Sequence, residues 1–200
     1  MNIAVFCSGN GTNFQAIVDA SKKKVFNATI SIMVCDNKDA FALERAKSEG
    51  IETLLVLREN FNTQQEFESK IIACLKKEDI KLICLAGFMR ILSPEFVNKY
   101  EARIINIHPA LLPSFKGAHA IKDAFEYGVK VTGVTVHFVT DELDSGPIIL
   151  QEHVKVEEKD TLKSLEKKIH KIEHKLYPEA IRLFTEGKLR IKGKKVESKK

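Results

Sequence analysis

Apolar runs alternate with amphipathic stretches along the first half of the chain. Five of these runs have almost no polar alternation, which is typical of strands buried on both faces; they cover residues 2–7, 28–36, 52–57, 81–87 and 103–108. Helical periodicity marks residues 13–24, 40–49 and 63–78, and Pro94 begins a short helix. This alternation predicts an α/β fold with a doubly wound, mostly parallel sheet and helices on both faces.

The pattern changes after residue 108. Residues 133–139 alternate between apolar and polar side chains, and residues 147–156 begin apolar and then alternate, which predicts later, antiparallel strands. A final helix is predicted over residues 161–185, where Pro178 should kink or interrupt it. One apolar stripe at spacings of three and four runs along this helix, formed by Leu162, Leu165, Ile169, Ile172 and Leu176.

Length and composition favour a single domain over residues 1–187. A chain of 200 residues with 44% hydrophobic content is long enough to bury a sizeable core. No apolar run approaches the ~20 residues that cross a bilayer, and the N-terminus has no basic segment of a secretory signal. The four cysteines show no CxxC spacing, so we expect reduced, buried thiols, a cytoplasmic location and no membrane partner.

The net charge of +5 is localised at the C-terminus. Seven basic and two acidic side chains between residues 186 and 200 account for the whole excess. The segment has no aromatic residue to interleave with the basic ones. We therefore predict a flexible, solvated basic tail at residues 188–200 and no nucleic-acid partner.

The loop SGNGTN, residues 8–13, joins the first predicted strand to the first helix. Gly9 and Gly11 allow tight backbone geometry, and free N–H groups at a helix start attract anions. A dinucleotide fingerprint needs a third glycine where Phe14 stands. A phosphate monoester is therefore a better candidate ligand for this loop than a dinucleotide. The alternative is an ordinary strand-to-helix turn.

Asn106 and His108 end the fifth apolar run. They are two residues apart on a strand, so both side chains point to the same face. An amide can stabilise an oxyanion and an imidazole can donate or accept a proton. The alternative is a structural Asn/His pair.

The acidic loop TDELDSGP, residues 140–147, follows a later strand and offers Asp141, Glu142 and Asp144. A carboxylate beside an imidazole favours its charged form. The alternative is an acidic surface turn.

The segment HKIEH, residues 170–174, has the H-x-x-E-H pattern of inverted zinc peptidases. A third ligand is not identified, so we predict no metal. His170, Glu173 and Tyr177 also share one helix edge, which could face a cleft or remain solvated.

In this order, SGNGTN, LAGFMRILSPEF, NIHPALLP and VTDELDSGPII closely resemble the folate-dependent phosphoribosylglycinamide (GAR) formyltransferases of purine biosynthesis, over residues 1–187. The wider formyltransferase family shares the Asn, His and Asp, so these identify the chemistry. The prediction that GAR is the substrate rests on the phosphate loop, the single domain and the EH..YP motif of residues 173–178.

The resemblance implies a Rossmann-like fold and formyl transfer from 10-formyltetrahydrofolate, the co-substrate, to the GAR amine without a metal. Its catalytic residues fall on Asn106, His108 and Asp144. Residues implied in GAR binding are Gly11, Thr12, Asn13, His170 and Glu173. Residues implied in folate binding are Leu85, Met89, Arg90, Ile91, Leu92, Val97, Asn106, Val139, Thr140 and Asp141.

Three positions depart from the family pattern. Gln64 stands in an expected loop where relatives often have a basic residue near the folate tail, which puts that contact in doubt. His170 replaces a common Gln near the phosphate, and Ala110 replaces the usual Ser after His-Pro.

Two alternative functions stay open, a sugar-nucleotide formyltransferase and a non-catalytic phosphate- or folate-binding module. We do not expect methionyl-tRNA formyltransferase or formyltetrahydrofolate hydrolase, because each carries a further domain for which this chain has no room. The sequence leaves monomer and homodimer open.

Overall fold

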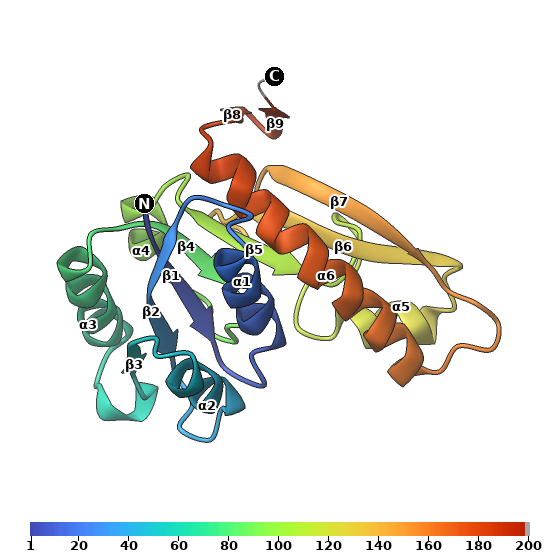
Figure 1. Ribbon diagram of the computed structural model, residues 1–200. Helices are drawn as coiled ribbons and strands as arrows, with labels where there is room; N and C mark the ends of the chain where they lie inside the picture. Colours follow the sequence, from blue (N-terminus) through green and yellow to red (C-terminus); the bar gives the residue numbers. More distant parts are fainter. Residues whose placement is uncertain (199–200) are drawn as a thin grey trace.

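The computed structural model describes residues 1–198 and contains a nine-stranded sheet with helices on both faces (Figure 1). The strands are β1 Asn2–Cys7, β2 Thr29–Cys35, β3 Thr53–Leu55, β4 Ile80–Leu85, β5 Ile104–His108, β6 Val131–Phe138, β7 Ile148–Lys155, β8 Leu189–Lys192 and β9 Lys195–Ser198. The helices are α1 Thr12–Lys22, α2 Phe41–Ser48, α3 Gln64–Lys77, α4 Pro94–Lys99, α5 Ala120–Tyr127 and α6 Leu162–Thr185, with a 3-10 turn η1 at Arg58–Asn60.

The strand order is β3-β2-β1-β4-β5-β6-β7-β9-β8. Strands β1 to β5 are parallel, whereas β6 is antiparallel to β5 and β7 is antiparallel to β6. The predicted doubly wound, mostly parallel sheet with later antiparallel strands is therefore confirmed. The chain winds outward from β1 in one direction and then resumes at β4 on the other side. Ligands of open α/β sheets bind at such a switch point, beyond the carboxyl ends of the strands.

Two apolar cores cover the two faces of the sheet. One core joins the sheet to α1, α2, α5 and α6, and the other joins it to α3 and α4. The central strands explain this double burial, since five of the six residues of β1 are fully buried. Continuous apolar runs in the sequence thus correspond to strands with helices on both sides.

Every predicted strand and helix is present, with ends within two residues of those expected. Helix α5 and strands β8 and β9 were not predicted. Within residues 1–198, no helix has the length and hydropathy needed to cross a membrane.

Helix α6 runs without a break through Pro178, so of the kink or interruption predicted at this proline, the interruption is wrong. Its apolar stripe packs on the sheet, with Leu165 and Ile169 fully buried. The buried Tyr177 hydroxyl lies 2.9 Å from the carbonyl oxygen of Leu85 and 3.0 Å from that of Ile105. One hydroxyl thus joins α6 to both β4 and β5. These tertiary contacts outweigh the backbone hydrogen bond that proline removes.

The segment after α6 is not the frayed tail that its charge suggested. Strands β8 and β9 follow α6 and form an antiparallel hairpin (Figure 1). Strand β9 pairs with β7 at Ile148 and Lys195. Leu189 and Val196 of the hairpin pack against the core that contains α6. Two apolar side chains, each flanked by charged residues, are thus enough to attach the segment to the sheet edge. Lys199 and Lys200 of the predicted tail lie outside the described residues.

Candidate active site

A cavity of about 710 Å³ opens at the carboxyl ends of β1, β4 and β5, beside the switch point of the sheet. Every residue that we predicted for the site lines it. The phosphate-loop side comprises Gly11, Thr12, Asn13, His170 and Glu173. The opposite wall comprises Leu85, Met89, Arg90, Ile91, Leu92, Val97, Val139, Thr140 and Asp141. Asn106, His108 and Asp144 also line it. The structure brings these side chains together, while their roles stay predictions.

The loop from Ser8 to Asn13 turns tightly into α1. Gly11 has a φ of +75°, and a Cβ atom there would lie only 2.7 Å from the Cβ of Ala42 on α2. Arg45 of α2 donates from Nε to the Asn10 carbonyl at 2.9 Å and from Nη2 to Asn10 Oδ1 at 3.0 Å. The loop is therefore held from behind, and the first N–H groups of α1 remain for an anion.

Glu173 of α6 links the loop to the helix edge. Its Oε2 accepts a hydrogen bond from Asn13 Nδ2 at 3.0 Å and lies 2.8 Å from His170 Nδ1. This hydrogen bond raises the pKa of His170, against the opposing effect of burial. Among residues 1–198 the buried Asn13 Oδ1 has no hydrogen-bond partner. The edge thus offers a carboxylate, an imidazole and a free amide oxygen to a polar ligand.

His108 and Asp144 lie together and are almost completely buried. His108 Nδ1 is 3.5 Å from Asp144 Oδ2, and that oxygen accepts the Gly117 N–H at 2.9 Å. His108 Nε2 is 2.8 Å from the Phe115 carbonyl oxygen, which can only accept, so Nε2 carries a hydrogen. The loop that precedes α5 therefore holds both the imidazole and the carboxylate.

His137 of β6 is a site residue that the sequence analysis missed. Its Nδ1 donates to the Phe138 carbonyl at 2.8 Å, so its Nε2 is left to accept from Asn106 Nδ2 at 3.3 Å. Burial lowers the pKa of His137, which favours the neutral ring. This contact fixes which way the Asn106 amide points. The pairing of Asn106 with His137 depends on the register between β5 and β6, which the sequence does not reveal.

The wall opposite the phosphate loop is mostly apolar, and Arg90, Thr140 and Asp141 are its polar members. Leu85, Leu92 and Val97 are buried, whereas the side chains of Met89 and Ile91 are 66% and 73% exposed at the rim. Large apolar side chains at this exposure leave a surface that a flat ligand could cover.

Gln64 is the first residue of α3 and not part of a loop, so its expected position was wrong. Its Nε2 donates to the Ile91 carbonyl at 3.2 Å and to Glu68 Oε1 at 3.0 Å. Gln64 therefore supports the backbone of the apolar wall.

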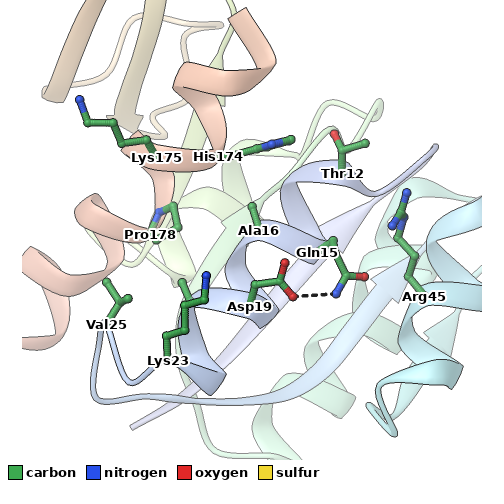
Figure 2. A pocket seen from close by; sticks show the side chains of 11 residues that line it. Thr12, Gln15, Ala16, Asp19, Lys23, Val25, Arg45, His174, Lys175 and Pro178 are labelled. Carbon is green, nitrogen blue, oxygen red and sulfur yellow. Dashed lines mark hydrogen bonds between the residues drawn. The ribbon is translucent and has the colours of Figure 1, made fainter. Parts of the chain in front are cut away.

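The two histidines of HKIEH line different cavities. His170 lines the main cavity, whereas His174 lines a second one of about 580 Å³ between α1 and α6 (Figure 2). Figure 2 shows the His174 side chain directed toward Thr12. The two rings stack in parallel with centroids 6.4 Å apart, and burial lowers the pKa of His174. Residues 1–198 contain no group of three side chains arranged to hold a metal ion.

Comparison with known proteins gives one consistent result. A family model described as formyl transferase matches residues 1–181. Phosphoribosylglycinamide formyltransferase of Bacillus subtilis is 44% identical over 90% of this chain and 92% of the relative. The Escherichia coli enzyme of the same name is 42% identical over 96% and 90%. The crystal structure of glycinamide ribonucleotide transformylase 1 from Symbiobacterium toebii superposes with a TM-score of 0.96 at 42% identity, covering 99% of this chain and 93% of that one.

Proposed function

Because the chain belongs to the formyl transferase family, we propose that it transfers the formyl group of 10-formyltetrahydrofolate to the amine of phosphoribosylglycinamide in purine biosynthesis. The products are formyl-GAR and tetrahydrofolate. The free thiols of Cys7, Cys35 and Cys84 suit a reducing compartment, and we assign the protein to the cytoplasm.

One observation carries this proposal: two unlike half-sites share one cavity, and Asn106, His108 and Asp144 line it with them. The Gly11 loop and the start of α1 suit a phosphate monoester. The carboxylate of Glu173 suits ribose hydroxyls or the glycinamide amine, since it can only accept hydrogen bonds. The wall with Met89 and Ile91 suits a pterin ring.

The reaction in this proposal needs no protein nucleophile. The glycinamide nitrogen attacks the formyl carbon, and a new C–N bond forms as the carbonyl oxygen becomes an oxyanion. The intermediate then collapses, the bond from carbon to folate N10 breaks, and the proton lost by the amine ends on N10. Holding both reactants in one cavity removes much of the entropic barrier.

We assign the oxyanion to the Asn106 amide N–H and to the His108 Nε2–H, which would exchange the Phe115 carbonyl for the oxyanion when the substrates bind. Each such donor contributes roughly 3 kcal/mol to the transition state. His137 Nε2 accepts from one amide hydrogen of Asn106, which orients the group. Asp144 lies beside His108 and holds the ring. His108, a bound water or both carry the proton from the amine to N10.

The test is an assay with GAR and 10-formyltetrahydrofolate that follows release of tetrahydrofolate. Turnover with GAR, and none when an amino-sugar nucleotide replaces it, is the expected result. Turnover with the sugar nucleotide alone would move the protein to that class. Binding of both ligands without turnover would make it a binding module.

Replacing any of Asn106, His108 or Asp144 by Ala should lower kcat about 100-fold or more and change KM much less, because each acts in the transition state. The matched controls are Asn98→Ala and His153→Ala, since both residues are exposed outside the cavity. Wild-type turnover in one of the three variants would remove that residue from the mechanism. Treatment with a metal chelator should leave the rate unchanged.

A further inference from the structure

Asp36 is a buried carboxylate that sequence motifs did not indicate. It follows the last residue of β2, and its side chain is only 6% exposed. Its Oδ1 accepts the Ser8 hydroxyl at 2.5 Å, and its Oδ2 forms an ion pair with Arg90 Nε at 2.7 Å. A buried charge is costly unless it is paired, so the two partners offset the cost of burying this carboxylate.

Ser8 extends this contact to the backbone of the cavity wall. Its Oγ accepts the Met89 N–H at 2.8 Å, and its own N–H donates to the Gly87 carbonyl at 3.0 Å. Asn37 Nδ2 donates to the Ser8 carbonyl at 3.1 Å. The segments that follow β1, β2 and β4 are thus joined around one hydroxyl and one carboxylate.

Arg90 is held on its inner side. Asp36 engages Nε, and the guanidinium carbon lies 5.9 Å from the centre of the Phe67 ring. The side chain is 40% exposed and lines the cavity. The outer edge of the guanidinium therefore remains for a ligand, while Asp36 sets where that edge lies.

We propose that Asp36 is a positioning residue for the folate co-substrate, acting through Arg90 and through the Ser8 contact to the Met89 backbone. The inference rests on the proposed function, because it takes the Met89–Arg90 wall to be the folate side of the cavity. Asp36 does not line the cavity itself, so its effect on binding passes through these neighbours.

The first test is Asp36→Asn, which keeps the shape and an acceptor for Ser8 but removes the charge that pairs with Arg90. We expect KM for 10-formyltetrahydrofolate to rise about tenfold, while kcat and KM for GAR stay within twofold. The matched control is Asp39→Asn, an exposed carboxylate in the same loop, which should change neither KM. Equal rises in both KM values would indicate general loss of structure and overturn the proposal, as would an unchanged folate KM.

A double-mutant cycle tests whether Asp36 acts through Arg90. Arg90→Gln alone should raise the folate KM, and adding Asp36→Asn to it should raise that KM by less than a further twofold. Independent, multiplying effects would overturn the route through Arg90. If Asp36→Asn does not fold, Ser8→Ala serves instead, because it leaves the ion pair in place. It should raise the folate KM by about threefold and the GAR KM by less.

Binding of tetrahydrofolate, measured by calorimetry, separates this inference from the proposed function. A wild-type chain that lacks turnover but binds tetrahydrofolate contradicts the function, and weaker binding in Asp36→Asn would still support the positioning role. A wild-type chain that binds no tetrahydrofolate would overturn both.

Discussion

Single residues outside the main cavity determine its shape as much as the residues that line it. Ala42 does not line the main cavity, yet its side chain sets how closely the phosphate loop can approach α2. Arg45 fixes Asn10 in the same way, by binding both its carbonyl and its side chain. The position of the backbone N–H groups therefore depends on contacts outside the ligand's reach.

Gly11→Ala should raise KM for GAR at least tenfold and lower the free energy of unfolding by about 1–3 kcal/mol. The φ of +75° disfavours any Cβ atom, and α2 leaves no room for one. Steady-state kinetics and chemical denaturation measure the two effects. Gly9→Ala is the control, because among the described residues nothing lies within 4 Å of a Cβ there. Similar losses of GAR binding and stability in both variants would show that the loop is sensitive to substitution for a reason other than the contact with Ala42.

His170 should make GAR binding depend on pH. Its hydrogen bond to Glu173 raises the pKa above 6.5, so the imidazolium persists toward neutral pH and is lost as pH rises through that raised pKa. Glu173 and Glu166 are the acidic groups that act on it. Below the pKa the positive charge favours a phosphate, and above it this attraction disappears.

We therefore expect KM for GAR to rise roughly tenfold between pH 6 and pH 9 in the wild type, the size of one charged hydrogen bond. His170→Gln should show a flat profile and the higher KM throughout. Identical profiles for the two proteins would place the phosphate away from His170.

At the scale of elements, local signals explain why the helices begin where they do. Thr63 accepts the Glu66 N–H at 3.1 Å, and Glu66 Oε2 in turn lies 3.4 Å from the Thr63 nitrogen. This capping box starts α3, which contributes Phe67, Ile71 and Leu75 to the second core. Sequence periodicity and capping thus agree.

Thr63→Ala should lower the free energy of unfolding by about 1 kcal/mol, because the first-turn N–H of Glu66 loses its acceptor. Urea denaturation measures the change. Gln65→Ala in the same turn is the control, and it should be neutral or slightly stabilising, because alanine is the better helix former. A loss of stability in the control equal to that of Thr63→Ala would show that the cap is not responsible.

The sequence predicted residues whose signal is local, within one strand or helix. It did not predict residues that become neighbours only through the pairing of strands distant in the chain. Asn106 and His108 were found because two residues on one strand share a face. His137 and Asp36 were missed because β6 and β2 bring them to the site from elsewhere in the chain. Strand β8 was missed because dense charge concealed Leu189, whose burial depends on packing with α6 and the sheet.

At the scale of the whole molecule, the main cavity and the sheet edge formed by the β8–β9 hairpin are separate. No residue of the described part of the β8–β9 hairpin lines the main cavity. The hairpin touches the rest of the sheet through one paired position on β7. Its contribution should therefore be to stability alone.

A chain ending after Gly187 should keep kcat and both KM values within twofold of the full-length protein. The free energy of unfolding should fall by about 1–2 kcal/mol, from the lost burial of Leu189 and Val196. Kinetics and thermal denaturation of the two chains measure this. A large loss of activity at unchanged stability would show that the hairpin reaches a substrate.

The late position of α6 in the chain has a consequence for synthesis on the ribosome. Domains form from the N-terminus as the chain emerges, so the phosphate loop and the parallel strands appear long before Tyr177 and Glu173 do. Until then the Leu85 and Ile105 carbonyls have no hydroxyl from α6, and Asn13 has no carboxylate to hold it. A nascent or prematurely terminated chain therefore carries the motif for a phosphate without the group that completes the site. Unfinished chains should not compete with the mature protein for its substrates.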